Sequence, residues 1–300
     1  MDILSAYPGH AEFFLRAILP SDHNAVPDHP LDRCLDLFYL NTAEHFTLKI
    51  PRQACEELFI TAAAPYLAAG GNNNLLPIFE AAHSVMLAVF SAPQNAELTA
   101  RHLPFYIDSL FAVFPANLTA RQFRLAFRTL ARLASPPATL AAAQPMLAAV
   151  LIELLRHRAE SATTEPIFPP EPSLNPSADT QPQPSPPLSE QAVLTLTIID
   201  TLTEVSLSLL QEELPLAAEM VNAIEDTAMR EYCKEHFWHT LVGGEMDPNR
   251  SQLCHAWWST AGGREAVLFG REDRFANEAR EDDGLVMSGG LGNEGGESKL

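Results

Sequence analysis

Apolar residues recur three and four positions apart along most of the chain, and this spacing predicts amphipathic α-helices in nearly every segment. Runs of β-branched residues, which favour strands, are scarce. Helices are expected over residues 12–19, 31–40, 51–67, 75–90, 97–114, 119–133, 139–158, 189–210, 216–241 and 250–259. Short helices with brief connections favour an all-α fold of stacked antiparallel helices, either a HEAT-like or armadillo-like solenoid or an irregular bundle.

Turn-forming residues separate the predicted helices and set their ends. Pro51 suits the first position of its helix, because it has no amide hydrogen to leave unpaired. Thr119 is expected to cap the helix that follows it, although no glutamate stands three residues later to complete a capping box. Gly262 and Gly263 are expected to stop the last helix.

Proline and glycine content predicts two segments outside the helices. Nine of the 24 prolines fall between Pro166 and Pro187, and because proline forbids helix and removes backbone donors, we expect a disordered linker or inserted loop there. A PxxP-type ligand for another protein is the alternative interpretation. The predicted organisation is a helical repeat region over 1–160, a proline-rich linker over 161–188, a C-terminal helical region over 189–270 and an acidic, glycine-rich, disordered tail over 271–300.

Composition narrows the classes of protein to consider. Of the 300 residues 47% are hydrophobic, which is enough for a sizeable core, and 19 Lys and Arg against 38 Asp and Glu give a net charge of −19. This charge repels phosphate, so no nucleic-acid partner is expected. Prolines interrupt the most apolar stretch, so no membrane-spanning helix is expected, and the N-terminus lacks the features of a signal peptide.

The sequence contains neither the cysteine spacing of a disulfide framework or zinc site nor a known catalytic motif. Cys34, Cys55, Cys233 and Cys254 form no C-x-x-C pair, so reduced, buried thiols are expected in place of disulfides. The sequence contains no G-x-S-x-G elbow, phosphate loop, dinucleotide fingerprint or H-E-x-x-H motif. We therefore expect neither catalytic residues nor a cofactor.

Cysteine and histidine residues occur close together in the C-terminal helical region. Cys233, His236 and His239, with Cys254-His255 further on, are metal-ligating residue types, but their spacing matches no standard site. Phenylalanine and tryptophan crowd the same segments, so packed positions in an aromatic core are expected instead, and no metal. The same core interpretation applies to His45 and His83, which lie among apolar helical residues.

Four arginines form a stripe on one predicted helix. Arg121, Arg124, Arg128 and Arg132 are spaced by three, four and four residues, so they share a face opposite the phenylalanines of the same helix. One interpretation is a solvated face that keeps the helix soluble. The other is a docking strip for an acidic segment of a partner.

The last three residues, Ser298, Lys299 and Leu300, form the tripeptide that a soluble receptor reads as a peroxisomal address. A small residue, a cation, an apolar side chain and the terminal carboxylate can enter a cleft of the receptor only if the tail is exposed. The tripeptide therefore predicts peroxisomal delivery and binding to the targeting-signal receptor.

Longer segments point to a family. The stretches that begin Tyr39-Leu-Asn-Thr-Ala, Phe79-Glu-Ala-Ala-His and Ala256-Trp-Trp-Ser-Thr, together with the C-terminal tripeptide, resemble the C-terminal part of the fungal intraperoxisomal peroxin eight family. Members of that family are longer, so we expect this chain to correspond to their C-terminal portion. Of the family's functional residues, the resemblance carries over only the targeting tripeptide.

The resemblance implies a peripheral protein on the luminal side of the peroxisomal membrane. It further implies an adaptor that bridges the docking and RING subcomplexes of the matrix-protein importer, binds the cargo receptor and helps to release cargo. Two alternatives stay open: a matrix enzyme whose tripeptide serves only for delivery, and a helical scaffold with a fortuitous C-terminus. A closed pocket with convergent polar groups would favour the enzyme.

Overall fold

The computed structural model describes residues 4, 6–20, 24–70, 72–167 and 187–270. These residues form helices and turns, and the only strand-like feature among them is an isolated antiparallel bridge between Pro166 and Ser189. The predicted all-α fold is confirmed. The disorder that we predicted for the body of the linker and for the tail concerns residues 168–186 and 271–300, which lie outside the described residues.

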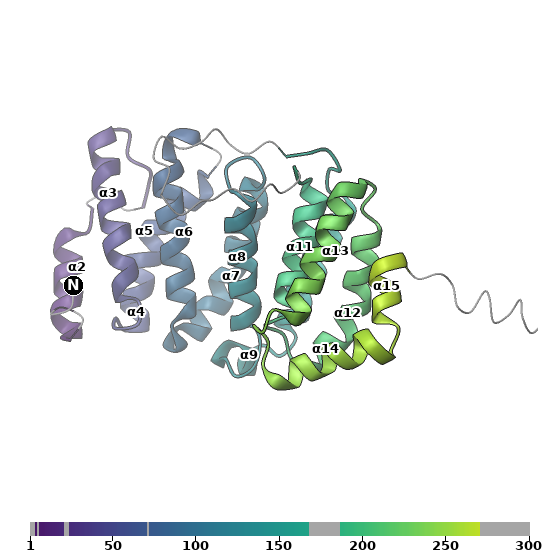
Figure 1. Ribbon diagram of the computed structural model, residues 1–300. Coiled ribbons are helices and arrows are strands. Elements are labelled where there is room, and N and C mark those ends of the chain that lie inside the picture. The colour runs from purple at the N-terminus through teal and green to yellow at the C-terminus, as the bar shows by residue number, and fades with distance from the viewer. Residues whose placement is uncertain (1–3, 5, 21–23, 71, 168–186, 271–300) are drawn as a thin grey trace, which may run out of the picture.

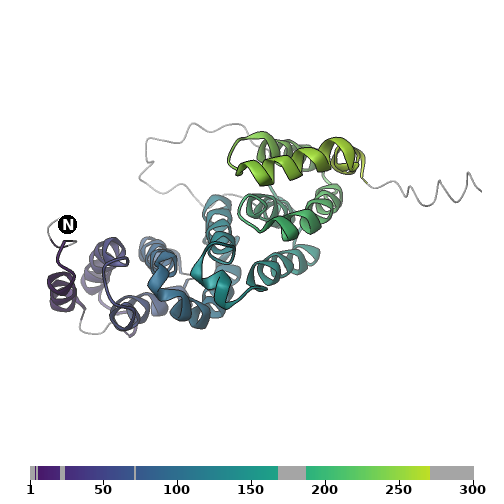
Figure 2. The same ribbon diagram turned by 90° about the horizontal axis from the view of Figure 1, so that it is seen from below.

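Helices α2 to α8 follow one another in chain order from the N-terminal end of the molecule, and α11 to α15 group together at the other end (Figure 1). Seen along the perpendicular direction, most N-terminal helices appear nearly end-on and form a stacked arrangement (Figure 2). The N-terminal part contains α2 (Pro8–Ile18), α3 (Pro30–Ala43), η1 (Glu44–Phe46), α4 (Arg52–Ala54), the π turn η2 (Cys55–Ile60), α5 (Thr61–Ala68), η3 (Asn73–Leu75), α6 (Leu76–Ser91), η4 (Pro93–Asn95), α7 (Ala96–Val113), α8 (Ala120–Leu133), α9 (Thr139–Ala143) and α10 (Leu147–Glu160). The C-terminal part contains α11 (Glu190–Thr201), α12 (Leu207–Asn222), α13 (Thr227–Val242), α14 (Pro248–Thr260) and α15 (Gly263–Phe269).

The predicted helix over 139–158 was wrong, because the chain forms α9 and α10 with a break between them. Pro145 lies in this break, and Gln144 before it has φ −135° and ψ 73°. A residue that precedes proline is disfavoured in the helical region, since the proline ring crowds its backbone. The proline therefore ends α9 where the apolar spacing alone suggested continuity.

Two further predicted helices, over 189–210 and 216–241, were also wrong in their bounds. The turn after Thr201 ends α11, and the hydroxyl groups of Thr201 and Thr203 donate to carbonyls three residues back, at 2.7 and 2.8 Å. Such side-chain bonds compete with the helical ladder. The second break lies before α13, where the Asp226 side chain accepts a 2.8 Å hydrogen bond from the amide of Met229 and caps a new helix.

The helix predicted over 250–259 ends at the glycines as expected, because α14 stops at Thr260 just before them; the short helix α15 that follows was not predicted. Gly262 has φ +77°, a left-handed conformation that glycine adopts without strain. A Cβ atom on Gly263 would lie 2.5 Å from the Trp257 ring, so only glycine allows α15 to turn back against α14.

A single hydrophobic cluster extends through the described chain, with buried members from Ala11 to Val267. Helix α11 packs against α8, α10, α12 and α13. Its residues are buried on every side, including Thr195 and Thr197, whose hydroxyl groups donate to carbonyls four residues back. A helix that is apolar all round is one that the fold buries completely.

The two described ends of the proline-rich segment lie side by side. The amide of Ile167 donates to the carbonyl of Leu188 at 2.7 Å, and the amide of Gln191 donates to the carbonyl of Thr163 at 3.2 Å. The described residues on the two sides of positions 168–186 are therefore neighbours in the fold.

Candidate interaction surface at the arginine stripe

The predicted arginine stripe lies on α8, which begins with a complete capping box. The amide of Gln122 donates to Thr119 Oγ1 at 3.2 Å, and the amide of Thr119 donates to Gln122 Oε1 at 3.1 Å. The predicted cap at Thr119 is confirmed. The expectation of an incomplete box was wrong, because a glutamine side chain supplies the same acceptor as glutamate.

Aromatic packing fixes the inward face of α8. Phe123 lies 4.3 Å from Phe114 and 4.8 Å from Phe127, measured between ring centroids. The ring of Phe111, on α7, contacts both Phe123 and Phe127. Phe123 and Phe127 are fully buried. This packing sets the rotation of α8 about its axis and turns the arginines away from the core.

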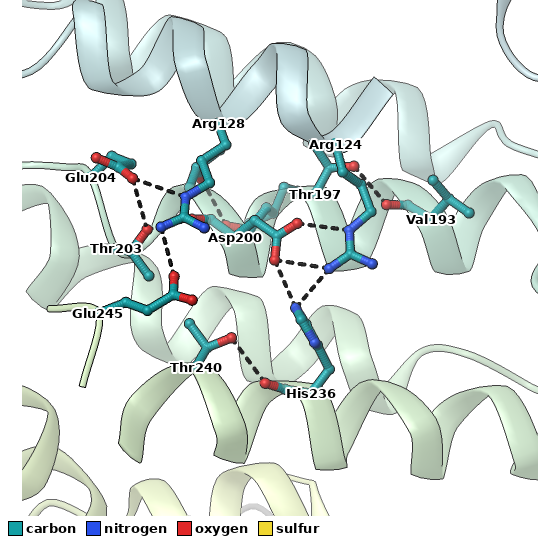
Figure 3. Close-up of polar contacts among 12 residues, drawn as sticks. Arg124, Arg128, Val193, Thr197, Asp200, Thr203, Glu204, His236, Thr240 and Glu245 are labelled. Carbon is teal, nitrogen blue, oxygen red and sulfur yellow. Dashed lines mark hydrogen bonds and ion pairs between the residues drawn. The ribbon is translucent and has the colours of Figure 1, made fainter. Parts of the chain in front are cut away.

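Arg124 points across to α11 and binds Asp200 with two parallel hydrogen bonds (Figure 3). Its Nε donates to Oδ2 at 2.7 Å and its Nη2 to Oδ1 at 2.9 Å. His236 of α13 lies against both groups, with its Nε2 at 2.7 Å from Asp200 Oδ1 and 2.8 Å from Arg124 Nη2. One ring nitrogen cannot both donate to the carboxylate and accept from the guanidinium, so the tautomer of His236 decides which contact is a hydrogen bond.

The electrostatics of this cluster favour the ionised carboxylate. Burial by itself would raise the pKa of Asp200, but hydrogen bonds from His236 and Arg124 outweigh it and hold the pKa below its usual value. The cluster therefore joins α8, α11 and α13 through a carboxylate that stays charged at neutral pH.

Arg128 repeats the pattern one turn further along α8 (Figure 3). Its Nε donates to Glu204 Oε1 at 2.9 Å, and its Nη2 donates to Glu245 Oε2 at 2.7 Å. Asp200 and Glu204 are four residues apart, the same step as Arg124 and Arg128, so two successive turns of α8 meet two carboxylates in register.

Helix α10 makes the same kind of contact with the C-terminal helices. Arg156 pairs with Glu213 of α12, and Arg158 Nη2 lies 2.9 Å from Glu190 Oε1 of α11. Burial raises the pKa of Glu213, although the neighbouring Arg156 opposes this shift. Arginines of α8 and α10 thus face carboxylates that come after the proline-rich segment.

The four arginines of the stripe do not share one environment. Arg124 and Arg128 are committed to carboxylates of this same chain, so for these two the acidic partner is internal. Arg121 and Arg132 are exposed, and the side chain of neither has a hydrogen bond or ion pair among the described residues. The docking interpretation stays a prediction that concerns this outer pair.

Sequence reasoning missed the carboxylates that face the stripe. Asp200 and Glu204 lie 76 residues after Arg124 and Arg128, and no local pattern connects such distant positions. The matched four-residue step in the two segments is the one signal that could have suggested the pairing.

The histidines and cysteines are dispersed, and the described residues contain no group of three or more metal-ligating side chains. Cys233 is buried as predicted, and burial raises its pKa to about 12. The predicted core position was wrong for His239, which is exposed, and for His236, which belongs to the Asp200 cluster. Aromatic pairs do form between α13 and α14, with ring centroids 5.9 Å apart for Phe237 and Trp257.

The other predicted burial states can also be compared with the structure: Cys55 and Cys254 are buried as expected, whereas His255 is exposed, so that prediction was wrong. His83 is buried, as expected, with its Nδ1 2.7 Å from the hydroxyl of Tyr106. His45 and Cys34 are exposed, so both of those predictions were wrong. The targeting tripeptide Ser298–Leu300 lies outside the described residues.

Comparison with known proteins gives the family. A model of the PEX8 central TPR-like domain matches residues 11–91, and a model of the PEX8 C-terminal domain matches residues 98–266. Together they cover most of the chain. The chain belongs to the PEX8 family. The family predicted from the sequence is therefore confirmed, and the stripe with all of its carboxylates lies within the PEX8 C-terminal domain.

A relative supports the same assignment. The peroxisomal membrane protein PEX17 of Yarrowia lipolytica is 26% identical over 266 residues, which is 84% of this chain and 39% of that protein. The chain therefore spans about two fifths of the length of this relative. No solved structure matches. Membership of the PEX8 family and this relative support a role in peroxisome biogenesis or import.

The two PEX8 domains meet at residues 92–97, where η4 separates α6 from α7. The predicted division at the proline-rich segment stays a prediction. Across the described residues no single helix combines the length and apolarity of a membrane span. One pair of helical segments, Leu76–Ser91 and Pro93–Val113, has the length and composition of a span when taken together, but the two segments are bent by 90° relative to each other.

Proposed function

We propose that this PEX8-family chain is a non-enzymatic adaptor of the peroxisomal matrix-protein importer. It lies at the luminal side of the membrane as a peripheral protein, bridges the docking and RING subcomplexes, and binds the cargo receptor to assist cargo release. The observation that carries the proposal is the match to PEX8 domains over residues 11–91 and 98–266.

The chemistry of the C-terminal tripeptide supports the receptor as one partner. Ser298, Lys299 and Leu300 supply the small, cationic and apolar side chains, with a terminal carboxylate, that the peroxisomal targeting receptor recognises. The same tripeptide delivers the chain to the peroxisome and makes it a ligand of the receptor.

The stacked helices suit an adaptor, because they present long outer surfaces and hold them at fixed spacing. We infer that the helical body contacts the receptor beyond its tripeptide cleft. The tail and the body then act as two linked attachments, and the linkage raises the effective concentration of the second contact. Loss of one contact weakens binding without abolishing it.

Affinity capture from solubilised peroxisomal membranes tests this function. The full chain should retain components of both importer subcomplexes together with the receptor. A variant that lacks residues 298–300 should bind less receptor but still retain importer components. Recovery of the receptor alone, with complete loss on removal of the tripeptide, would identify the chain as ordinary cargo and favour the matrix enzyme.

A further inference from the structure

Three residues of α8 form a line that no described part of the chain covers. Arg121 and Arg132 are exposed, their guanidinium groups have no hydrogen-bond or ion-pair partner among the described residues, and Leu125 between them is 60% exposed. At about 100° per residue, the three side chains lie within roughly 40° of one another around the helix. With a rise of 1.5 Å per residue, the two arginines lie about 16 Å apart.

The inner pair of the stripe shows what α8 recognises. Arg124 and Arg128 bind Asp200 and Glu204 through planar guanidinium contacts of 2.7–2.9 Å, and these two carboxylates repeat at the step of the arginines. The outer pair has the same chemistry on a neighbouring line of the same helix. It differs in having no carboxylate of the described residues in place.

We infer that Arg121, Leu125 and Arg132, here called the α8 docking line, bind an acidic helical segment of another protein. That segment places one carboxylate against each arginine and an apolar side chain against Leu125. The inference deepens the proposed adaptor function and rests on it for the source of the segment, a component of the importer.

Charge around the line favours a single helix over a membrane surface. Glu80 of α6 is hydrogen-bonded to Gln122, and Glu204 and Glu245 lie against Arg128. A helix can contact the line alone, whereas an anionic bilayer would also approach these carboxylates. With a net charge of −19, the chain as a whole is repelled by such a bilayer.

Site-specific photo-cross-linking identifies the occupant. Benzoylphenylalanine replaces Leu125 in the full chain, which is added to solubilised peroxisomal membranes and irradiated, and the cross-linked peptide is sequenced. The control carries the same group at Leu154, an exposed apolar position of α10. We expect a cross-link from position 125 to a segment rich in Asp and Glu at helical spacing, at least fivefold above the control position.

Charge reversal then tests the arginines. Arg121→Glu with Arg132→Glu should lower the cross-linking yield at least fivefold. The matched control, Lys49→Glu with Arg264→Glu, changes net charge equally at exposed cations that have no ion pair among the described residues, and should leave the yield within twofold. Unchanged circular dichroism and melting of all variants show that the fold is kept.

Several outcomes overturn the inference. These are a cross-link to lipid, to a basic or uncharged segment, to a second copy or to residues 271–300 of the chain itself, no cross-link above the control, and an equal loss in both charge-reversal pairs. If the chain floats with phosphatidylserine vesicles and this flotation requires Arg121 and Arg132, the partner of the docking line is a membrane surface and the inference of an acidic helix is wrong.

The result separates the docking line from the proposed function. If the unmodified chain captures importer components but position 125 gives no cross-link, only the docking line fails. If position 125 cross-links to an acidic helix of a protein outside the importer, and no importer component is captured, the docking line stands and the adaptor function fails.

Discussion

Two regions use charged residues differently: the N-terminal stack, which is α2 to α7, and the junction, where α8 and α10 face the C-terminal helices α11 to α13. In the stack, the ion pair of Arg52 and Glu97 lies at the surface, with 51% and 67% of the side chains exposed. At the junction, Arg124 and Asp200 are only 20% and 14% exposed, and His236 packs against them. Exposed pairs contribute little to stability, whereas removal of one partner from a buried pair leaves an uncompensated charge.

Apolar side chains are also more exposed on α3, in the stack, than on α11, at the junction. Leu31, Leu35 and Phe38 lie exposed along one face of α3, while the apolar residues of α11 are buried on all sides. The open face of α3 therefore offers apolar surface to solvent or partners, whereas α11 presents none.

The largest expected effect comes from the centre of α11. Leu196→Ala removes a fully buried side chain, and we expect it to lower the free energy of unfolding by about 3 kcal/mol through lost burial and a residual cavity. Leu35→Ala on the open face of α3 should leave the stability nearly unchanged, within about 0.5 kcal/mol. Urea denaturation followed by circular dichroism measures both. Equal losses would show that Leu196 and Leu35 do not differ in burial as described.

The two regions should respond to acid in different pH ranges. Burial lowers the pKa of His83 in α6 to about 4, so the unfolded chain binds a proton there more readily than the folded chain. Stability from His83 is complete above pH 6.5 and is lost as the pH falls toward 4, by about 3 kcal/mol in total. The lowered pKa of Asp200 contributes stability that is present above its usual value near 4 and is lost only below it.

Urea titrations between pH 7 and pH 4 test this difference. The wild-type chain should lose stability over that range, and His83→Gln should remove most of the slope whatever it does to stability at pH 7. Asp200→Asn should leave the slope above pH 4.5 unchanged. A slope that depends on Asp200 and not on His83 would reverse the assignment.

Loss of a junction arginine should have a smaller effect that is still clear. Arg124→Gln leaves Asp200 with His236 alone, and we expect a loss of about 2 kcal/mol, reduced from the value for fully buried pairs because the cluster is partly solvated. Arg52→Gln, the matched change in the exposed pair, should have no measurable effect.

A double-mutant cycle identifies the cause of the Arg124 effect. If the loss arises from the uncompensated carboxylate, Asp200→Asn combined with Arg124→Gln should recover part of it. Additive losses would mean that Arg124 acts through packing alone. Chemical denaturation of the three variants and the wild type supplies the four values.

The smallest expected effect concerns helix caps. Thr119→Ala removes the capping box of α8 and should cost about 1 kcal/mol. Ser206 precedes α12 without a side-chain hydrogen bond to its amides, so Ser206→Ala serves as the control and should change stability by less than about 0.3 kcal/mol. Thermal melting compares the two, and equal shifts would argue against a stabilising role for the box.

Most of the fold could be predicted from the sequence, while several helix bounds could not. The apolar spacing located α3, α6, α7 and α8 well, because their core faces follow the helical repeat. It missed the break between α11 and α12, where threonine hydroxyls at 201 and 203 compete for helical carbonyls. The apolar spacing also predicted one continuous helix through Pro145, because apolar residues recur at helical intervals on both sides of this proline.

The arginine stripe was recognised from the sequence, but its division into an inner and an outer pair was not. Spacing placed all four arginines on one face of a helix. Only the packing of α11 against α8, and of α13 against α11, shows that Arg124 and Arg128 are used internally, while Arg121 and Arg132 remain exposed.

The sequence by itself determined the helical nature of the chain, the cap at Thr119, the separate proline-rich segment and the resemblance to the PEX8 family. These properties depend on residues a few positions apart or on the presence of a segment as such. The tertiary structure decided which carboxylates meet which arginines, where α11 ends and which histidines are buried. Those outcomes depend on contacts between residues as many as 117 positions apart, as for Arg128 and Glu245, and only the packing of the whole chain brings such residues together.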